Sequence, residues 1–317
     1  MAAIPSPETG DIQVGPLAVH VYGLMYAIGV FAAIMLTSRL WEGRGGSREL
    51  VYDVALWGFP AGLIGGRLYF IATSWSEVPS HWWGPLAVWK GGLSIWGGIA
   101  LGTVVGVWRL RRARADAYAF MDVAAPGLLI AQAIGPIGNY FNQELFGKPT
   151  DLPWALQIDP AHRPAGYAQF TGFHPTFLYE LLFDIALAGV LLALLRRGRI
   201  RPPGVFALYV TGYSGFRIFE ETLRIDPSHH VLGLRLNFFV AASLCLAGIT
   251  WFIRSQRVGR VLQRGATLVA IGATAAALGA CGDAPIRHDG AVATPPRGGH
   301  LALTLKAILP SRAGRPG

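Results

Sequence analysis

The sequence predicts an all-α protein, a polytopic helical bundle that crosses a membrane about seven times. Of its 317 residues, 52% are hydrophobic and only 14% are charged, whereas a soluble domain carries about 25% charged residues. The apolar residues gather in long runs, and the mean hydropathy of the chain is +0.41. The basic residues lie in short runs between them, as in the loops of membrane proteins. The net charge of +9 therefore does not indicate a nucleic-acid partner.

Seven hydrophobic segments are candidate spans, because a membrane helix needs about 20 mostly apolar residues. Several contain Gly or Pro, which membrane helices tolerate where neighbouring helices satisfy the backbone. The segments are residues 19–38, 51–73, 93–108, 118–137, 176–195, 204–219 and 232–253. We expect them to form one transmembrane domain, residues 1–255.

The arginines predict how the bundle is oriented. Clusters of arginine follow the first, third, fifth and seventh segments. Because Lys and Arg favour the cytoplasmic loops of membrane proteins, these four connections are expected in the cytoplasm. The N-terminus is then outside and the C-terminus is cytoplasmic. The long connection 138–175 and the connection that carries Glu220, Glu221 and Arg224 are expected outside.

A tail, residues 256–317, is expected to follow the transmembrane domain. It contains an Ala-rich apolar run that ends in LGAC at residues 278–281, which resembles the lipobox of a lipoprotein signal. The run is short for a membrane span, so we interpret it as an Ala-rich tail with a chance match, or as a weak eighth helix. The remainder has a disordered composition. The two cysteines, Cys245 and Cys281, predict neither a disulfide framework nor a metal site.

Four ionisable residues fall inside the predicted spans, namely Arg67, Glu180, Asp184 and Arg217. A charge at the middle of a membrane costs about 2.5–3.5 kcal/mol by insertion scales, so such residues are candidates for function. Glu180 and Asp184 are four residues apart, which places them on one face of a helix. They are expected to point into the bundle.

The sixth span carries the most informative pattern. Tyr213, Arg217, Glu221 and Arg224 are spaced by four, four and three residues, which places them on one face of a helix. A guanidinium held near the outer headgroups would suit the phosphate of a lipid, which it can bind through two hydrogen bonds. The alternative, a structural ion pair between Arg217 and Glu221, fits the spacing equally well.

A dense polar stretch follows the fourth span. Asn139, Asn142 and Glu144 come where that span ends, and glycines such as Gly147 allow tight turns. These groups could bind a polar headgroup, or line a cleft where lipid meets a soluble substrate. The alternative is an ordinary surface loop, although Trp154 indicates that the stretch stays near the membrane interface.

Two more candidates lie at the expected outer ends of spans. His174 precedes the fifth span and could act as a base, because its unperturbed pKa is about 6.5. A single histidine at a helix end is more often structural. Tyr22 is paired with Tyr26 in the first span. The pair either lines a cleft or belongs to the interfacial belt of aromatic residues, and the belt is the more conservative interpretation.

Six sequence blocks carry a family resemblance. In chain order they read VYGLMYAIG, GGRLYFI, WKGGLSIWGGIALG, GNYFNQELFGKPTDLPW, HPTFLYELL and GYSGFRIFEETLR. Together they resemble the bacterial phosphatidylglycerol–prolipoprotein diacylglyceryl transferases. The residues within the blocks are most similar to those of actinobacterial members. The resemblance covers residues 17–253.

The resemblance implies a seven-helix enzyme of the bacterial plasma membrane, with its active site toward the outer face. Such an enzyme transfers the diacylglyceryl group of phosphatidylglycerol to the thiol of the lipobox cysteine in a preprolipoprotein. This is the first step of lipoprotein maturation. The expected partners are therefore the lipid and the lipobox segment, with no metal and no organic cofactor.

The resemblance and the patterns above together predict the site residues. Those expected to act in catalysis are Glu144, His174, Tyr213, Arg217 and Glu221. Those expected to bind substrate are Tyr22, Arg67, Asn139, Asn142 and Gly147. Arg217 is expected to hold the phosphate, with Arg67 as a helper. Glu221 is expected to orient Arg217, because a carboxylate close to an arginine is a poor base. Either Glu144 or His174 is expected to accept the thiol proton.

Two positions depart from the family pattern. Pro136 stands where the signature usually carries an arginine, and Trp96 stands where many members carry a histidine. Pro136 opens the alternative of a catalytically impaired relative that binds lipid or lipoprotein without turnover. A small-solute transporter with an Arg217–Glu221 gate is a further alternative. It ranks last because transporters usually contain internal repeats, and none is visible in the sequence.

Overall fold

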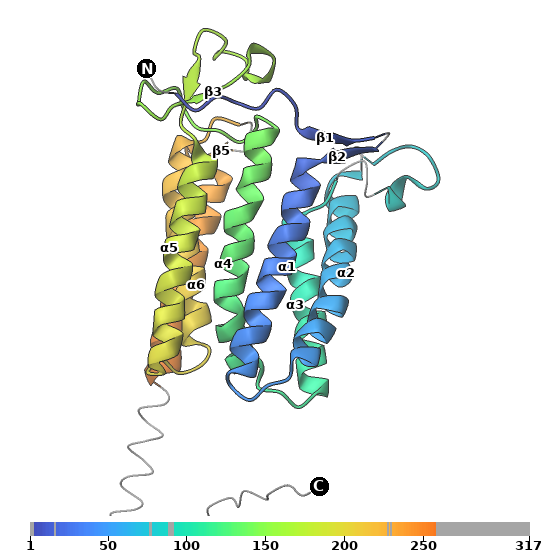
Figure 1. The fold of residues 1–317 in the computed structure, drawn as a ribbon, viewed down its shortest axis with the longest axis vertical. Helices are drawn as coiled ribbons and strands as arrows, with labels where there is room; N and C mark the ends of the chain where they lie inside the picture. The colour runs from blue at the N-terminus through green and yellow to red at the C-terminus, as the bar shows by residue number, and fades with distance from the viewer. Residues whose placement is uncertain are drawn as a thin grey trace, which may run out of the picture. The chain divides into compact units, whose positions relative to one another are not determined.

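The computed structural model describes residues 3–15, 17–75, 78–87, 92–226, 228 and 230–257. The predictions for the tail beyond residue 257, including Cys281, lie outside these residues. Within the described part the chain is mostly helical, and long helices run side by side in alternating directions (Figure 1). Their bounds are α1 Val21–Glu42, α2 Arg48–Thr73, α3 Ile95–Arg112, α4 Ala117–Phe141, α5 Thr176–Arg197, α6 Gly204–Leu223 and a further helix, Leu236–Arg257.

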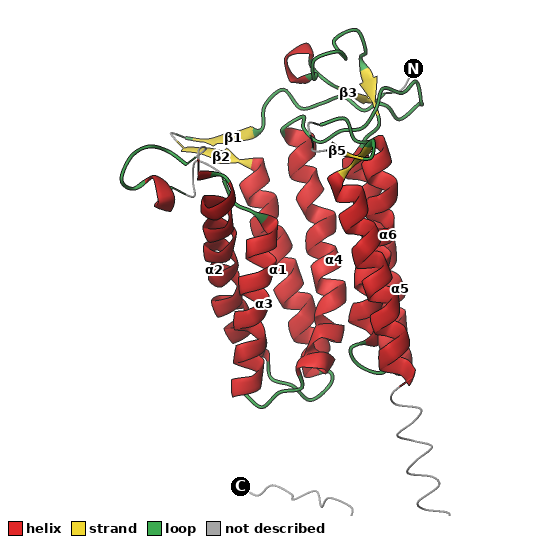
Figure 2. Ribbon diagram, turned by 180° about the vertical axis from the view of Figure 1, so that it is seen from behind, coloured by secondary structure: helices red, strands yellow, loops and turns green. Residues whose placement is uncertain are grey.

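Short strand pairs lie at one end of the helices, where Figure 2 shows them in yellow. The pairs are β1 (Asp11–Val14) with β2 (Leu17–His20), β3 (Leu156–Gln157) with β4 (Gly172–Phe173), and β5 (His230–Val231) with β6 (Leu234–Arg235), all antiparallel. The all-α prediction therefore describes the bundle but not this end. Strands of two to four residues are too short to show the alternation of apolar and polar residues that predicts a strand.

Among the described residues, five helices are long and apolar enough to cross a membrane, namely α1, α2, α4, α5 and Leu236–Arg257. The other two long helices, α3 and α6, each carry three charged residues, which lower their hydropathy. In α3 all three are arginines of the last turn, whereas in α6 they are Arg217, Glu220 and Glu221. The chain is therefore a multi-pass helical membrane protein.

The fourth helix continues past the hydrophobic segment that predicts it. α4 runs to Phe141 and carries Asn139 in its last turn. Pro136 is buried inside this helix, and the helix continues through it. A proline costs a helix one backbone hydrogen bond, which membrane helices tolerate where neighbouring groups satisfy the backbone. Proline at position 136, in place of the arginine of the family signature, therefore changes the side chain but does not end α4.

The sixth helix is also longer than its hydrophobic segment. It runs to Leu223, so Glu220 and Glu221 are buried residues of its last turn. This corrects their predicted place in an outer connection, and the reason is that hydropathy marks only the apolar part of a helix. The last helix begins at Leu236 instead of residue 232, because β5 and β6 occupy the residues before it.

The two ends of the bundle differ in composition. The helices α1, α3 and α5 have basic last turns, and Leu236–Arg257 carries Arg254 and Arg257. Since neighbouring helices alternate in direction, these arginines gather at one end, here called the arginine-rich end (Figure 1). The opposite end, here called the loop end, carries the strand pairs and the connection between α4 and α5.

Packing differs between the two sides of the bundle. α4 packs against α1, α5 and α6, and it buries Val123 and Leu129 completely. α2 packs on α3 with glycine against glycine. A Cβ added to Gly65 would lie 2.3 Å from the carbonyl oxygen of Gly97, so only glycine permits this approach.

Candidate active site

Charged side chains from α5, from the end of α6 and from the connection after α6 gather at the loop end. Hydrogen bonds and ion pairs join them, and none of them is exposed. We call them the arginine–carboxylate cluster. Its members are Glu180, Arg217, Glu220, Glu221, Arg224, Asp226 and Arg235.

Arg217 makes the most ion pairs in this cluster. One terminal nitrogen of its guanidinium donates to Glu220, and the other donates to Glu221 over 2.6 Å. A third carboxylate, Glu180, lies 3.9 Å from the guanidinium. Helical spacings of three and four residues bring Glu220 and Glu221 to this side of α6, so the predicted pairing of Arg217 with Glu221 is confirmed. The side chain of Arg217 is 20% exposed, which leaves it accessible to a polar ligand.

The inner side of the cluster is formed by α5. The Tyr213 hydroxyl of α6 donates to Glu180 over 3.0 Å. Asp184, one turn deeper in α5, is fully buried, and neither of its carboxylate oxygens has a hydrogen-bond partner among the described residues. Glu180 and Asp184 therefore point into the bundle, as their spacing predicts.

The connection after α6 completes the cluster with Arg224, which the stripe of the sixth span includes, and with Asp226 and Arg235, which no sequence pattern indicated. Arg235 donates from Nε to Glu221 over 2.7 Å, and from a terminal nitrogen to Asp226 over 2.8 Å. Arg224 donates from Nε to the other oxygen of Asp226 over 2.7 Å. Burial alone would raise the pKa of Asp226, but the hydrogen bonds and charges of Arg224 and Arg235 hold it below its ordinary value. The signal that could have found them is the dense charge beside the end of a span.

A compact cap covers the loop end. It consists of the connection 142–173 and the N-terminal residues 3–10, which run along it. Ile4 donates its N–H to the carbonyl of Ala155 over 2.8 Å, which holds the N-terminal segment in place. The apolar core of the cap consists of Phe146, Leu156, Ile158 and Phe173. The polar stretch after α4 is therefore part of a folded unit and not an open surface loop.

Gly147 joins the cap to α5 and α6. Its N–H donates to the carbonyl of His174 over 2.9 Å, and it pairs with Arg224 in an antiparallel bridge. A Cβ at this position would lie 2.8 Å from the Cβ of His174. Only glycine permits this approach. Gly147 therefore has a packing role, which aligns Arg224 with the cap.

The predicted polar residues at the end of α4 lie together. Asn142 donates from its side-chain amide to Glu144 over 3.1 Å, and the N–H of Glu144 donates to the carbonyl of Asn139 over 3.0 Å. Tyr22 of α1 packs against the same end of α4, where a Cβ added to Gly138 would lie 2.4 Å from the tyrosine ring.

His174 lies directly before α5, at the edge of the cap. Its Nδ1 is 3.0 Å from the hydroxyl of Tyr179, and Trp154 donates to the same hydroxyl over 3.1 Å. Burial, and to a lesser degree the charge of Lys148, lowers the pKa of His174 below its ordinary value of 6.5. The imidazole is therefore neutral near pH 7 and can accept a proton.

Arg67 lies in α2 and is buried. Its guanidinium donates to the carbonyl oxygens of Gly84, Pro85 and Gly92, over 2.7, 2.8 and 2.9 Å. These contacts hold the connection between α2 and α3. Backbone carbonyl groups therefore engage all three nitrogens of this guanidinium.

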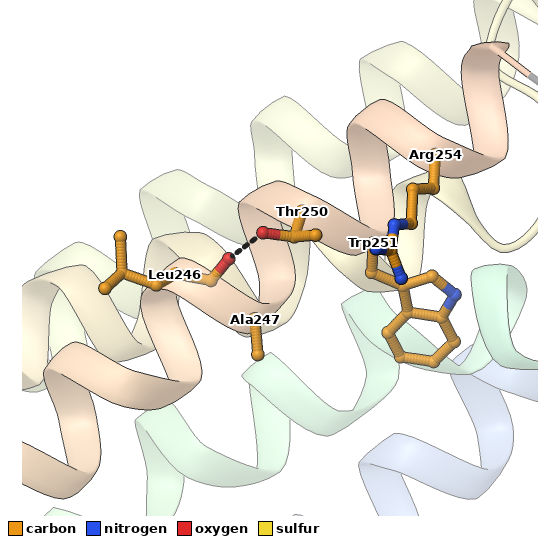
Figure 3. A pocket seen from close by; sticks show the side chains of 5 residues that line it. All are labelled: Leu246, Ala247, Thr250, Trp251 and Arg254. Carbon is orange, nitrogen blue, oxygen red and sulfur yellow. Dashed lines mark hydrogen bonds between the residues drawn. The ribbon is translucent and has the colours of Figure 1, made fainter.

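A hollow on the helix Leu236–Arg257 lies toward the arginine-rich end (Figure 3). Its lining residues are Leu246, Ala247, Thr250, Trp251 and Arg254. The Thr250 hydroxyl donates to the carbonyl of Leu246 over 2.8 Å, so it is already satisfied within the helix. The hollow contains a single charged side chain and no member of the arginine–carboxylate cluster. Its lining contains no carboxylate and no histidine, so it lacks a side chain that accepts a proton near neutral pH.

The loop end can support two kinds of chemistry. A guanidinium stabilises negative charge on phosphate oxygens, and carboxylates or a neutral imidazole accept protons. Within the part of the chain that the structure describes, no group of three or more His, Cys, Asp or Glu side chains is arranged to hold a metal ion. The loop end combines groups that suit a negatively charged ligand with groups that suit proton transfer.

Comparison with known proteins identifies the family. The family model described as prolipoprotein diacylglyceryl transferase matches residues 11–254. A Streptomyces coelicolor protein named phosphatidylglycerol–prolipoprotein diacylglyceryl transferase 2 is 44% identical over 281 residues, which cover 86% of this chain and 87% of the relative. Proteins named phosphatidylglycerol–prolipoprotein diacylglyceryl transferase from Streptomyces griseus and Cutibacterium acnes are 44% and 42% identical, over 81% and 80% of this chain and 79% and 87% of the relatives. The resemblance found in the sequence blocks is confirmed, and the chain belongs to the prolipoprotein diacylglyceryl transferase family.

Proposed function

We propose that this protein transfers the diacylglyceryl group of phosphatidylglycerol to the thiol of a lipobox cysteine in a preprolipoprotein. Membership of the family, and the activity for which its relatives are named, support this function. They also favour turnover over the impaired-relative and transporter alternatives. The observation that carries the proposal is the position of Arg217, a partly exposed guanidinium fixed by carboxylates at the loop end.

The reaction is a displacement at the glyceryl carbon. The thiol gives its proton to a base, because the thiolate is the nucleophile. The sulfur forms a bond to the glyceryl carbon while the carbon–oxygen bond to phosphate breaks, and the electron pair leaves with glycerol phosphate. Negative charge develops on the leaving group, so a fixed positive group facing it accelerates the step. Holding lipid and peptide together adds to the rate by positioning.

Arg217 is the group that we assign to the departing phosphate. Glu220 and Glu221 fix its guanidinium, which still remains accessible. A cation that is already oriented stabilises developing charge without reorganising during the reaction. Glu221 acts as its orienting partner, and Tyr213 orients Glu180 behind it.

The remaining polar residues are assigned to the base and to substrate contacts. His174 is the favoured base because its imidazole is neutral near pH 7, and Glu144 is the other candidate. Tyr22, Asn139 and Asn142 are assigned to the glycerol or peptide part of the substrates. Arg67 is assigned to holding its own loop, because carbonyl groups occupy its donors.

The site is assigned to the outer face of the bacterial plasma membrane. We take α3 and α6 to cross the membrane with the five more apolar helices, which gives seven spans. The arginine-rich end is then cytoplasmic, because basic residues favour that side, and the N-terminus and loop end are outside. Cysteines introduced at Trp154 and Arg114 test this arrangement with a membrane-impermeant thiol reagent. The Trp154→Cys variant should react in intact cells and the Arg114→Cys variant should not, and the reverse labelling would overturn the orientation.

The function is tested by transfer of labelled diacylglycerol from phosphatidylglycerol to a lipobox peptide. The purified wild type should label the peptide. Arg217→Ala should lower the rate on the order of 100–1000-fold, the cost of removing one group that stabilises developing negative charge. Arg111→Ala, which removes an exposed arginine at the other end of the bundle, should leave the rate unchanged. A folded Arg217→Ala enzyme with the wild-type rate would exclude this arginine from the mechanism.

A further inference from the structure

Two different arginines bind the two oxygens of the Glu221 carboxylate. Arg217 donates to Oε1 over 2.6 Å, and Arg235 donates to Oε2 over 2.7 Å. The side chain of Glu221 is fully buried, so these donors determine its orientation. We propose that Arg235 is a positioning residue of the transferase, which holds Glu221 against Arg217 and so fixes the guanidinium that faces the phosphate. This inference rests on the proposed function.

The contacts of Arg235 suit it for holding other residues and not for binding substrate. Besides its bond to Glu221, its two terminal nitrogens donate to the carbonyl oxygen and to Oδ2 of Asp226, over 2.6 and 2.8 Å. Every nitrogen of the guanidinium is therefore engaged. The side chain is 8% exposed, which leaves little surface for a ligand. Arg235 can act on the reaction only through the carboxylates that it binds.

The place of Arg235 in the chain gives it this role. It ends β6, pairs there with His230 of β5, and directly precedes the helix Leu236–Arg257. Glu221 lies in the last turn of α6. The hydrogen bond between them therefore joins the end of one helix to the start of the next. Asp226 strengthens this link, because its second oxygen accepts from Arg224.

Loss of Arg235 would change the position of Arg217. A buried carboxylate that loses one of its two cationic partners is strongly destabilised, so Glu221 would turn toward another donor and draw Arg217 with it. A misplacement of about 1 Å costs on the order of 100-fold in rate. Because the charge on the phosphate develops in the transition state, the loss should appear in kcat and leave KM nearly unchanged.

The test compares Arg235→Gln with the wild type in the peptide-labelling assay. We expect kcat to fall on the order of 10–100-fold, with KM for the peptide within about twofold of the wild type. Arg109→Gln is the matched control, because it breaks another pairing of an arginine with a carboxylate, that of Asp53, at the arginine-rich end. This control should lower the melting temperature and leave kcat and KM unchanged.

Two further variants keep the test decisive. Arg235→Lys retains the charge but lacks the planar fork that reaches two carboxylates at once, so its kcat should lie between those of Arg235→Gln and the wild type. The double variant Arg235→Gln/Glu221→Gln should lose no more kcat than Glu221→Gln alone, because Arg235 acts through Glu221.

Several results would overturn the positioning role and leave the proposed function intact. One is a folded Arg235→Gln enzyme with the wild-type kcat and a lowered melting temperature, as expected for Arg109→Gln. Another is full additivity of the Arg235 and Glu221 substitutions. A third is failure of both Arg235 variants to fold, which would assign the residue to stability. A wild-type enzyme that labels no peptide would overturn the proposed function and the inference together.

Discussion

The two sides of the bundle hold their charged side chains in different ways. On the α2–α3 side, Arg109 donates to both oxygens of Asp53 over 2.6 and 2.7 Å, so one guanidinium meets one carboxylate. The rings of Trp57 and Trp108 lie 5.6 and 5.4 Å from the same guanidinium. The charges of Arg109 and Asp53 neutralise each other, and the pair joins α3 to α2.

The α5–α6 side is not balanced in this way. Its arginine–carboxylate cluster contains three guanidinium groups and four carboxyl groups, and the unbonded Asp184 lies behind them. A matched ion pair holds two helices in register. Where ionisable groups are in surplus, some of them can gain or lose a proton or exchange one ion-pair partner for another. Such groups are typical of active sites. The α2–α3 side thus serves assembly, whereas the α5–α6 side is suited to chemistry.

Among the effects that test this contrast, the largest concerns His174, the proposed base. His174→Gln should lower kcat/KM about 100-fold at neutral pH, because a positioned base contributes about 10²–10⁴ in rate. In the wild type, kcat/KM should fall with decreasing pH through a value below 6.5, since burial lowers the pKa of His174 and only the neutral imidazole accepts a proton. A pH profile of kcat/KM measures both. If the acid limb persists in His174→Gln and disappears in Glu144→Gln, the base is Glu144.

The next effect concerns the close packing of α2 on α3. A Cβ at position 97 would lie 2.1 Å from the carbonyl oxygen of Gly65, so Gly97→Ala should destabilise the protein, by about 1–3 kcal/mol for such overpacking. Gly106→Ala in the same helix is the control, because its Cβ would meet Val54 at 3.6 Å, an ordinary contact. Thermal unfolding in detergent measures both variants, and equal melting temperatures would contradict the packing account.

The smallest effect sharpens the contrast between matched and surplus charges. Asp53→Asn should cost about 1 kcal/mol of stability, the value of a partly exposed ion pair, and leave transfer unchanged. Glu180→Gln should leave the melting temperature close to that of the wild type, because the remaining carboxylates still bind Arg217. The same variant should lower the rate of transfer. Melting temperature and peptide labelling are measured on both proteins. The opposite pattern would mean that the α5–α6 charges serve assembly as well.

Local patterns were sufficient to predict the helical membrane fold and part of the side-chain arrangement at the candidate site. Hydropathy and arginine distribution are properties of single segments, so they indicated the positions of the long helices and the basic ends of several of them. The Tyr213–Arg217–Glu221 stripe could be predicted in the same way, because residues four apart face the same side of any helix. Glu180 and Asp184 were expected inside the bundle for the same reason, and both are buried there.

Contacts between segments that are distant in the sequence could be identified only from the folded structure. No spacing rule joins Arg235 to Glu221 across a strand pair, or brings Gly147 beside Arg224. Arg67 shows the same limit, because its charge within a span indicated function, whereas the packed loop surrounds it with carbonyl groups. Helix periodicity acts over one or two turns, but the partner of a buried charge is set by which elements pack against each other. That depends on the shape of every side chain between them.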